Sequence, residues 1–199
     1  MTPTLAPDPS DSVLGDWYAN LIRVGRTQLV LAVSERTLLP VVLEAKDSGT
    51  LVRRLADALG SMLMELGVPD EAVTAERVAM TDWVVAKTAS RRVLGSLNDL
   101  AFQLKVGLAH WPQRTLMEHS LWLAKTPLKV IEYGAPDNTT VAAFTTQRVL
   151  TAASSASGPR REPDASAPRP RWCFCPAWTA PAHCSIRSSK RCRVLCAPK

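Results

Sequence analysis

The chain opens with three short segments whose apolar residues follow the pattern of β-strands. Residues 17–24 alternate between two sides, as expected for a strand with two different faces. Residues 25–28 include a glycine and predict a turn, because glycine tolerates positive φ. Residues 29–33 and 38–43 are continuous apolar runs, which are typical of strands covered on both faces. Pro40 favours an edge position for the last strand, so the pattern predicts a three-stranded meander.

Apolar residues then recur at steps of three and four, the period of an amphipathic helix. The first such stripe ends at Gly67 and Pro69, and a shorter helix is predicted over residues 70–80. A second stripe lies within residues 94–108, and a fourth helix is predicted over residues 115–124. We expect the leucines of the two stripes to be buried against the sheet: Leu55, Leu59, Leu97, Leu100 and Leu104.

Three further segments have the composition of strands. Residues 82–88 form a β-like run between the second and third helices. Residues 128–133 and 140–144 predict a closing hairpin around a Gly-Ala-Pro-Asp-Asn turn. The predicted order is β-β-β-α-α-β-α-α-β-β, which is an α+β fold with a mostly antiparallel sheet and helices packed on one face.

The composition changes abruptly near Phe144. Residues 1–14 read as a loose leader and residues 15–146 as a single α+β domain. Residues 147–199 have the Arg, Pro, Ser and Ala content of a disordered tail. All five cysteines lie in this tail, and an out-of-frame reading of a GC-rich gene would give the same mixture.

The positive charge of the chain also belongs to the tail. The formal net charge is +6, but residues 151–199 hold nine basic and two acidic residues, whereas residues 1–150 hold 15 basic and 16 acidic residues. The domain therefore lacks the basic character that a nucleic-acid binder usually has. The leader lacks the basic and apolar regions of a signal peptide, and no segment has the roughly 18 apolar residues of a membrane span. We expect a cytoplasmic protein with no membrane partner.

Three stretches resemble an uncharacterised bacterial domain family of unknown function, about 150 residues long. They are GDWYANLIRVGRTQLVLAVSERTLLPVV, KTASRRVLGSLNDL and LMEHSLWLAKTP, and the resemblance covers roughly residues 15–144. The family's T-x-N-R-S-V-x-G-x-x-N-D segment is matched here by Thr88, Arg91, Val93, Gly95, Asn98 and Asp99. Ser90 and Arg92 depart from it, because the family usually has Asn and Ser there. The resemblance implies domain limits and no particular function.

The segment from Lys87 to Asp99 is the best candidate for a binding site. It predicts a strand end, a short polar loop and a helix start, at which either Ser90 or a Ser96–Asp99 capping box forms the cap. Cations beside a helix N-terminus oppose the helix dipole, and a bound anion would relieve that conflict. The alternative is a solvated loop before an ordinary cap. The anion-binding candidates are Lys87, Ser90, Arg91, Arg92, Ser96 and Asn98.

Other candidate sites are weaker. Arg23 and Arg26 lie near Trp17 and Tyr18 in the first hairpin and could bind nucleic acid, but aromatic residues on a half-buried strand are more often core. His119 follows a glutamate without the second histidine of a zinc motif. Among the tail cysteines only the last pair has the spacing of a zinc knuckle. We expect no metal, no cofactor and no catalytic residue.

The sequence favours a small binding or regulatory module with an anionic ligand or a nucleic-acid backbone as its partner. Two alternatives stay open. One is an enzyme that acts on a phosphorylated substrate and uses Lys87 and Arg91 to clamp the anion. The other is a protein-interaction module that uses an exposed apolar strip of the third or fourth helix.

Overall fold

The computed structural model describes residues 12–81, 83–86, 90–155 and 171–174. Its first half contains the predicted meander of β1 (Trp17–Val24), β2 (Thr27–Ser34) and β3 (Pro40–Glu44). β1 pairs antiparallel with β2, with Trp17 opposite Ser34 and Val24 opposite Thr27. The turn between them contains Gly25 at φ 58, a conformation that favours glycine. The predicted meander is therefore confirmed.

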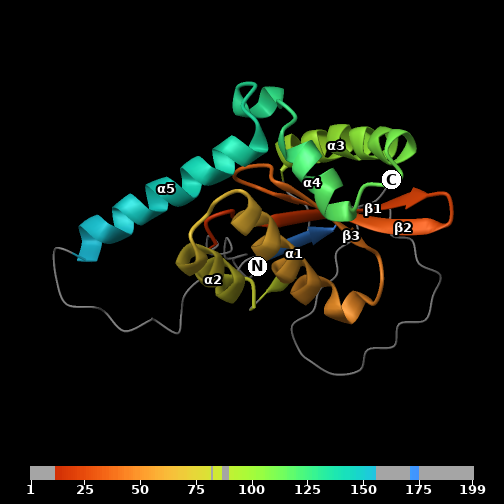
Figure 1. Cartoon of the computed structure of the whole chain (residues 1–199). Helices are drawn as coiled ribbons and strands as arrows, with labels where there is room; N and C mark the ends of the chain where they lie inside the picture. Colours follow the sequence, from red (N-terminus) through yellow and green to blue (C-terminus); the bar gives the residue numbers. More distant parts are fainter. Residues whose placement is uncertain (1–11, 82, 87–89, 156–170, 175–199) are drawn as a thin grey trace, which may run out of the picture.

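Two short strands extend the sheet beyond β1. They are β4 (Val84–Ala86) and β5 (Arg171–Phe174), and the strand order is β3-β2-β1-β5-β4. β5 is parallel to both of its neighbours. Figure 1 shows β5 within the sheet beside β1, although it lies far along the chain. The sheet is therefore antiparallel at one end and parallel at the other.

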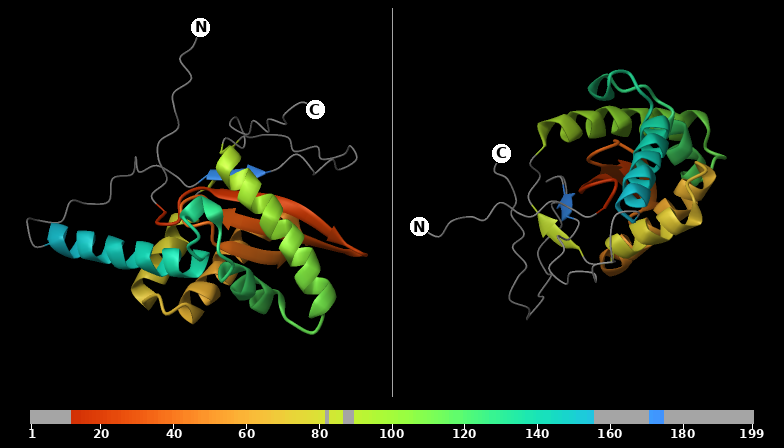
Figure 2. Two further views of the ribbon diagram at one scale, coloured as in Figure 1. Left: turned by 90° about the horizontal axis from the view of Figure 1, so that it is seen from above. Right: turned by 90° about the vertical axis from the view of Figure 1, so that its left-hand side faces the viewer.

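Helices cover both faces of the sheet. One face packs against α1 (Leu51–Glu65), which follows the short 3-10 turn η1 (Ser48–Thr50), and α2 (Asp70–Ala79) packs against α1 on the same side. The other packs against α3 (Arg91–His110). Figure 2 shows the strands lying between these two layers. The α+β class is confirmed, but the expectation that helices pack on one face is wrong, because the continuous apolar run of β2 buries residues on both sides.

The apolar stripes of the two long helices form the two halves of the core. The five predicted core leucines are all fully buried: Leu55, Leu59, Leu97, Leu100 and Leu104. The α1 leucines pack with Trp17, whereas the α3 leucines pack with Tyr18, its neighbour on β1. Successive residues of a strand point to opposite faces, so adjacent aromatic residues serve different layers.

The fourth helix, α4 (Leu116–Ala124), lies along the β3 edge of the sheet. The Ser120 hydroxyl accepts the Val42 backbone N–H at 2.9 Å and donates to the Leu116 carbonyl at 2.8 Å. α4 also approaches α3 closely at Gly107, where an added Cβ would lie only 2.8 Å from the Trp122 ring. The helix therefore satisfies a backbone donor that an edge strand otherwise leaves to water.

The predicted closing hairpin does not form. Residues 129–131 form the 3-10 turn η2 (Lys129–Ile131), and the chain then enters α5 (Pro136–Ser155). The expected pairing survives only as an isolated antiparallel bridge between Leu128 and Gly134. Thr140 and Phe144 are both buried, and their spacing of four residues matches one helix face. The order matches the prediction through α4; α5 then stands where the closing hairpin was expected.

The structure describes residues on both sides of the predicted limits of 15 and 146. Ser12 and Leu14 are fully buried, so the packed chain begins before the predicted start. α5 continues to Ser155, and residues 171–174 form β5, so both elements reach beyond residue 146. Residues 1–11, 156–170 and 175–199, on which the rest of the leader and tail predictions fall, lie outside the described residues.

Candidate functional site

The first turn of α3 contains three of the six candidate residues. Ser90 occupies the N-cap position, and its Oγ accepts the backbone N–H of Val93 at 3.4 Å. Of the two predicted caps the structure has Ser90, and the Ser96–Asp99 capping box is wrong because the helix has begun five residues earlier. Arg91 and Arg92 are the first two residues of the helix, and both are exposed.

Positive charge at this turn has no counterpart in the part of the chain that the structure describes. Neither Arg91 nor Arg92 forms an ion pair there, and the first turn of α3 holds no acidic residue. The backbone N–H groups of these two residues precede the intrahelical ladder, so the helix itself gives them no acceptor. The helix dipole adds a partial positive charge at the same place. The turn thus combines two guanidinium groups with two backbone donors.

The other three candidates do not join this group. Ser96 is buried, and its hydroxyl donates to the Arg92 carbonyl at 3.4 Å, one turn back along the helix. Asn98 is exposed about two turns beyond the cap. Lys87 lies outside the described residues. The geometry brings together Ser90, Arg91 and Arg92 alone.

The first hairpin does not offer a stacking surface. Trp17 and Tyr18 are only 0% and 1% exposed, so their interpretation as core residues is confirmed. Arg23 and Arg26 lie at the turn end of the hairpin, whereas Trp17 pairs with Ser34 at the opposite end. Bases could not stack on these buried rings while the arginines contact a phosphate.

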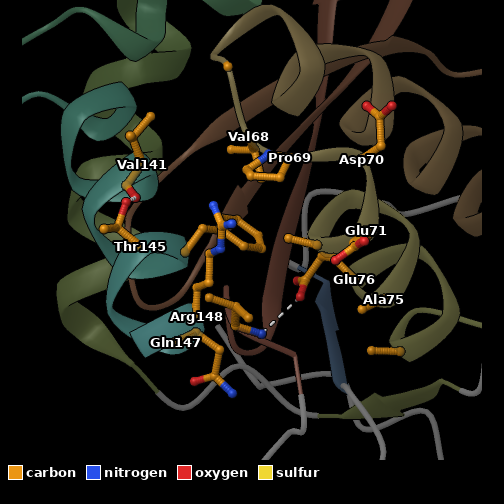
Figure 3. Close-up of a pocket in the computed structure, with 15 residues that line it drawn as sticks. Val68, Pro69, Asp70, Glu71, Ala75, Glu76, Val141, Thr145, Gln147 and Arg148 are labelled. Carbon is orange, nitrogen blue, oxygen red and sulfur yellow. Dashed lines mark hydrogen bonds between the residues drawn. The ribbon is translucent and has the colours of Figure 1, made fainter. Parts of the chain in front are cut away.

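A cavity of about 670 Å³ between α2 and α5 was not anticipated from the sequence. Its volume lies within the range of about 300–1,000 Å³ that is typical of small-molecule sites. Val68, Pro69 and Phe144 contribute apolar surface, and Arg148 extends into the cavity from α5 (Figure 3). Arg148 forms no ion pair with a described residue. The carboxylates of the cavity lie on the α2 side, opposite the arginine (Figure 3).

Glu76 is the buried carboxyl group on that wall. Its two oxygens accept hydrogen bonds from the Ser12 hydroxyl, from the Val13 N–H at 2.9 Å and from the Leu14 N–H at 3.4 Å. Burial raises the pKa of Glu76, because the carboxylate loses its water, and these hydrogen bonds and Arg36 oppose the shift. The donors all come from one segment, so Glu76 anchors residues 12–14 to α2.

Sequence reasoning missed Glu76 because the α2 segment looks like an ordinary solvated helix. A signal was nevertheless present. Val73 and Met80, both buried, lie three residues before and four residues after Glu76. This spacing places the carboxyl group on the buried stripe of the helix, where a charged residue requires a partner.

A second buried titratable group lies where α3 meets α4. His119 is fully buried, and neither ring nitrogen has a hydrogen-bond partner of good geometry among the described residues. Burial lowers the pKa of His119, because the imidazolium would be desolvated, and the Trp111 backbone partly offsets this shift. Trp111 forms a T-shaped contact with Trp122, with ring centroids 5.3 Å apart. The Arg114 guanidinium lies over the Trp111 ring, 4.4 Å from its centroid.

A scan against family models matches residues 1–139 to the family described as Domain of unknown function (DUF6933). The chain belongs to this family. The match confirms the resemblance found in the sequence, although it begins at the first residue and ends inside α5 rather than spanning 15–144. Comparisons with curated proteins and with solved structures gave no match.

The family match divides the described elements unevenly. It includes β1 to β4, α1 to α4 and the α3 turn with its two arginines. Most of α5 and all of β5 lie beyond its last matched residue. None of the helices in the described parts of the chain is long and apolar enough to cross a membrane.

Proposed function

We propose that the chain is a small binding module that takes an anionic ligand at the first turn of α3. The phosphate groups of a nucleic-acid backbone are the ligand chemistry that fits this turn. The observation that carries the proposal is the unmatched positive charge of Arg91 and Arg92 at a helix N-terminus whose first turn holds no acidic residue. Ser90 caps only one of the free backbone donors there.

Physical chemistry supports an anion at this position. Cations in the first turn of a helix cost a few tenths to about 1 kcal/mol, since they face the positive end of the dipole. A phosphate would reverse the sign of that interaction and accept charge-assisted hydrogen bonds from both side chains. The near balance of charge in residues 1–150 favours such a local site over a broad basic surface.

The test compares two double variants that remove the same charge. Arg91→Ala/Arg92→Ala removes the α3 arginines, and Arg23→Ala/Arg26→Ala removes two exposed arginines at the β1–β2 turn. Fluorescence anisotropy measures binding to labelled single-stranded DNA of about 16 nucleotides and to a duplex of the same length. Amide chemical shifts in NMR spectra measure the binding of inorganic phosphate alone.

We expect the α3 variant to lose binding and the hairpin variant to retain it. For the duplex, each lost phosphate contact should make the plot of log affinity against log salt shallower by about 0.9. Binding of phosphate without DNA would indicate a free anion as the ligand. If both variants bind every probe as the parent does, the turn is not an anion site.

One observation favours the protein-interaction alternative. Phe102 is 69% exposed and Val106 is 39% exposed, and they lie one turn apart on the outer side of α3. A second copy of the chain is the simplest partner to test. Sedimentation velocity at increasing concentration should show that the parent associates and that Phe102→Asp removes this association. A monomeric parent excludes this contact.

The enzyme alternative requires a titratable group with a shifted pKa beside the bound substrate. Among the described residues, the groups with shifted pKa values are Glu76, Glu118 and His119, which lie on α2 and α4.

A further inference from the structure

The parallel end of the sheet contains a strand, β5, that comes from a distant part of the chain. β5 lies between β1 and β4 and pairs with both of them. Trp17, Tyr18 and Ala19 of β1 pair with residues 172–174, and Val84 to Ala86 of β4 pair with residues 171–173. If β5 is removed, β1 and β4 face each other across two strand spacings, about 9–10 Å.

The family match includes the two strands that border this gap but not the strand that fills it. β1 and β4 both lie inside the matched residues 1–139, whereas β5 lies more than thirty residues beyond them. The family domain therefore supplies two parallel strand edges with room for one strand between them. Backbone N–H and C=O groups along such edges need partners, and a strand inserted from elsewhere can provide them.

The connection to β5 contains enough residues for β5 to leave the gap between β1 and β4 while it stays attached to the chain. Fifteen residues, 156–170, separate the end of α5 from β5. Fully extended, they would span about 50 Å. A strand that is covalently linked to its site competes with free peptide through its effective concentration.

We infer that the gap between β1 and β4 is a strand-acceptor site for a short extended polypeptide segment that enters parallel to β1. In this chain residues 171–174 occupy the site in cis, and a segment of a partner protein takes the same place when they leave. Recognition rests on backbone hydrogen bonds to both neighbouring strands, so the partner is defined by an extended conformation and by N–H groups on both sides. The inference does not depend on the anion site of α3.

The experiment uses the full chain with Trp172→Pro/Cys173→Pro. Proline lacks the backbone N–H and is excluded from central strands, so the substitution releases β5 and leaves residues 1–170 unchanged. The probe is a synthetic peptide of residues 169–176 with both cysteines replaced by serine. Hydrogen exchange followed by NMR reports on the amides of residues 17–19 and 84–86.

We expect exchange to be at least ten times faster in the double-proline variant than in the parent at those amides of the two segments that face β5; amides of β1 that face β2 keep their partners. Adding the probe peptide should restore protection, and a peptide with proline at positions 172 and 173 should not. The amides that join β2 to β3 serve as the internal control for folding and should exchange as in the parent. The parent itself should bind the probe at least about 100-fold more weakly than the variant, since its own strand competes.

Two results would overturn the inference as a whole, and a third would overturn its peptide form. One is equal exchange in parent and variant at both segments, which would mean that β5 does not protect them. The other is fast exchange in the variant that millimolar probe does not slow, which would mean that the gap closes or takes no strand in trans. The third is protection of the variant by added parent protein but not by the peptide. This result would identify a second copy of the chain as the occupant and overturn the peptide form of the inference.

A crosslinking variant tests the same site if the double-proline chain fails to fold. Ala86 and Cys173 are partners in the β4–β5 register, and neighbouring strand positions have the Cα separation that a disulfide requires. Ala86→Cys, with the other four cysteines replaced by serine, should form an internal disulfide on oxidation. Excess peptide that carries the cysteine of position 173 should divert it into a mixed disulfide. Val84→Cys, which pairs with Arg171, is the matched control and should react with the peptide far less.

Discussion

The strands at the two ends of the sheet differ in length and in how far apart their partners lie in the sequence. At the antiparallel end, β1, β2 and β3 follow one another in sequence and pair along most of their length. At the parallel end, β4 and β5 have three and four residues, and β5 pairs with residues more than 150 positions away in the chain. Local turns close the first set, whereas the second must close a long loop before any contact forms. We infer that the antiparallel end provides most of the stability and that the strand at the parallel end is exchangeable.

The largest effect should come from the core of the antiparallel end. Leu59→Ala and Leu100→Ala each remove a fully buried side chain from one of the two helical layers. We expect each to lower the free energy of unfolding by about 2–5 kcal/mol, from lost burial and from the cavity left behind. Denaturation in urea measures the loss, and Leu150→Ala, at a side chain 61% exposed, is the control. Equal midpoints for the core variants and the control would contradict the assigned faces.

A smaller effect is expected when β5 is released. Trp172→Pro/Cys173→Pro removes two backbone donors from the parallel end, and each hydrogen bond contributes about 0.5–1.5 kcal/mol. The loss of stability should therefore be about 1–3 kcal/mol, measured by the same urea titration. The composition of the segment after residue 153 predicts no contribution to folding, whereas the pairing of β5 predicts that a chain ending at residue 153 loses the same amount, about 1–3 kcal/mol. A loss as large as that of Leu100→Ala would show that the two ends are equally essential.

The pH dependence of stability should report on the helices of the antiparallel end. His119 has a pKa below its usual value of 6.5, so the unfolded chain binds its proton more readily than the folded chain. Stability should therefore fall as the pH decreases below about 6.5, with a slope of at most about 1.4 kcal/mol per pH unit for one proton. Glu76 has the opposite sign: its raised pKa means that stability should fall as the pH rises above 4.5 toward the pKa of the folded state.

Two substitutions separate these contributions. His119→Leu should flatten the decline below pH 6.5, because it removes the group that gains a proton on unfolding. Thermal melting from pH 5.5 to 7.5 measures the change, and the double-proline variant should keep the slope of the parent. An unchanged slope in His119→Leu would assign the pH dependence to another group.

The smallest effect on stability belongs to the proposed binding turn. Arg91→Ala/Arg92→Ala should change the free energy of unfolding by no more than about 0.5 kcal/mol, because both side chains are exposed and form no described ion pair. The sign should favour the variant, since the arginines oppose the helix dipole. Unfolding of the variant would mean that the arginines are structural.

The sequence predicted the elements whose pattern is local. The meander, the stripes of α1 and α3 and the Ser90 cap depend on neighbouring residues, and each is present. Residues 140–144 were predicted to be a strand because threonine and valine favour strands, yet the burial of Thr140 and Phe144 on one side stabilises a helix. Tertiary packing decided between two local patterns that a short segment cannot distinguish.

The failures at the parallel end and at Glu76 have a different cause. Nothing near residues 171–174 predicts a strand, because the partners of this segment lie on β1 and β4. Glu76 is likewise explained only by donors on residues 12–14, more than sixty positions away. The prediction that helices pack on one face of the sheet was wrong for a simpler reason: the continuous apolar run of β2 already required a layer of helices on each face.

The contact between α4 and β3 has a consequence for how the protein behaves at high concentration. A sheet grows into a fibre when the outermost strand offers unpaired backbone groups to a neighbouring molecule. Here Ser120 takes the Val42 N–H at one margin, and the strand at the other margin, β4, has only three residues. Both margins are poor templates for polymerisation. Ser120→Ala would leave the Val42 donor open, and the chain would then be expected to form amyloid-like assemblies sooner than the parent in a thioflavin assay.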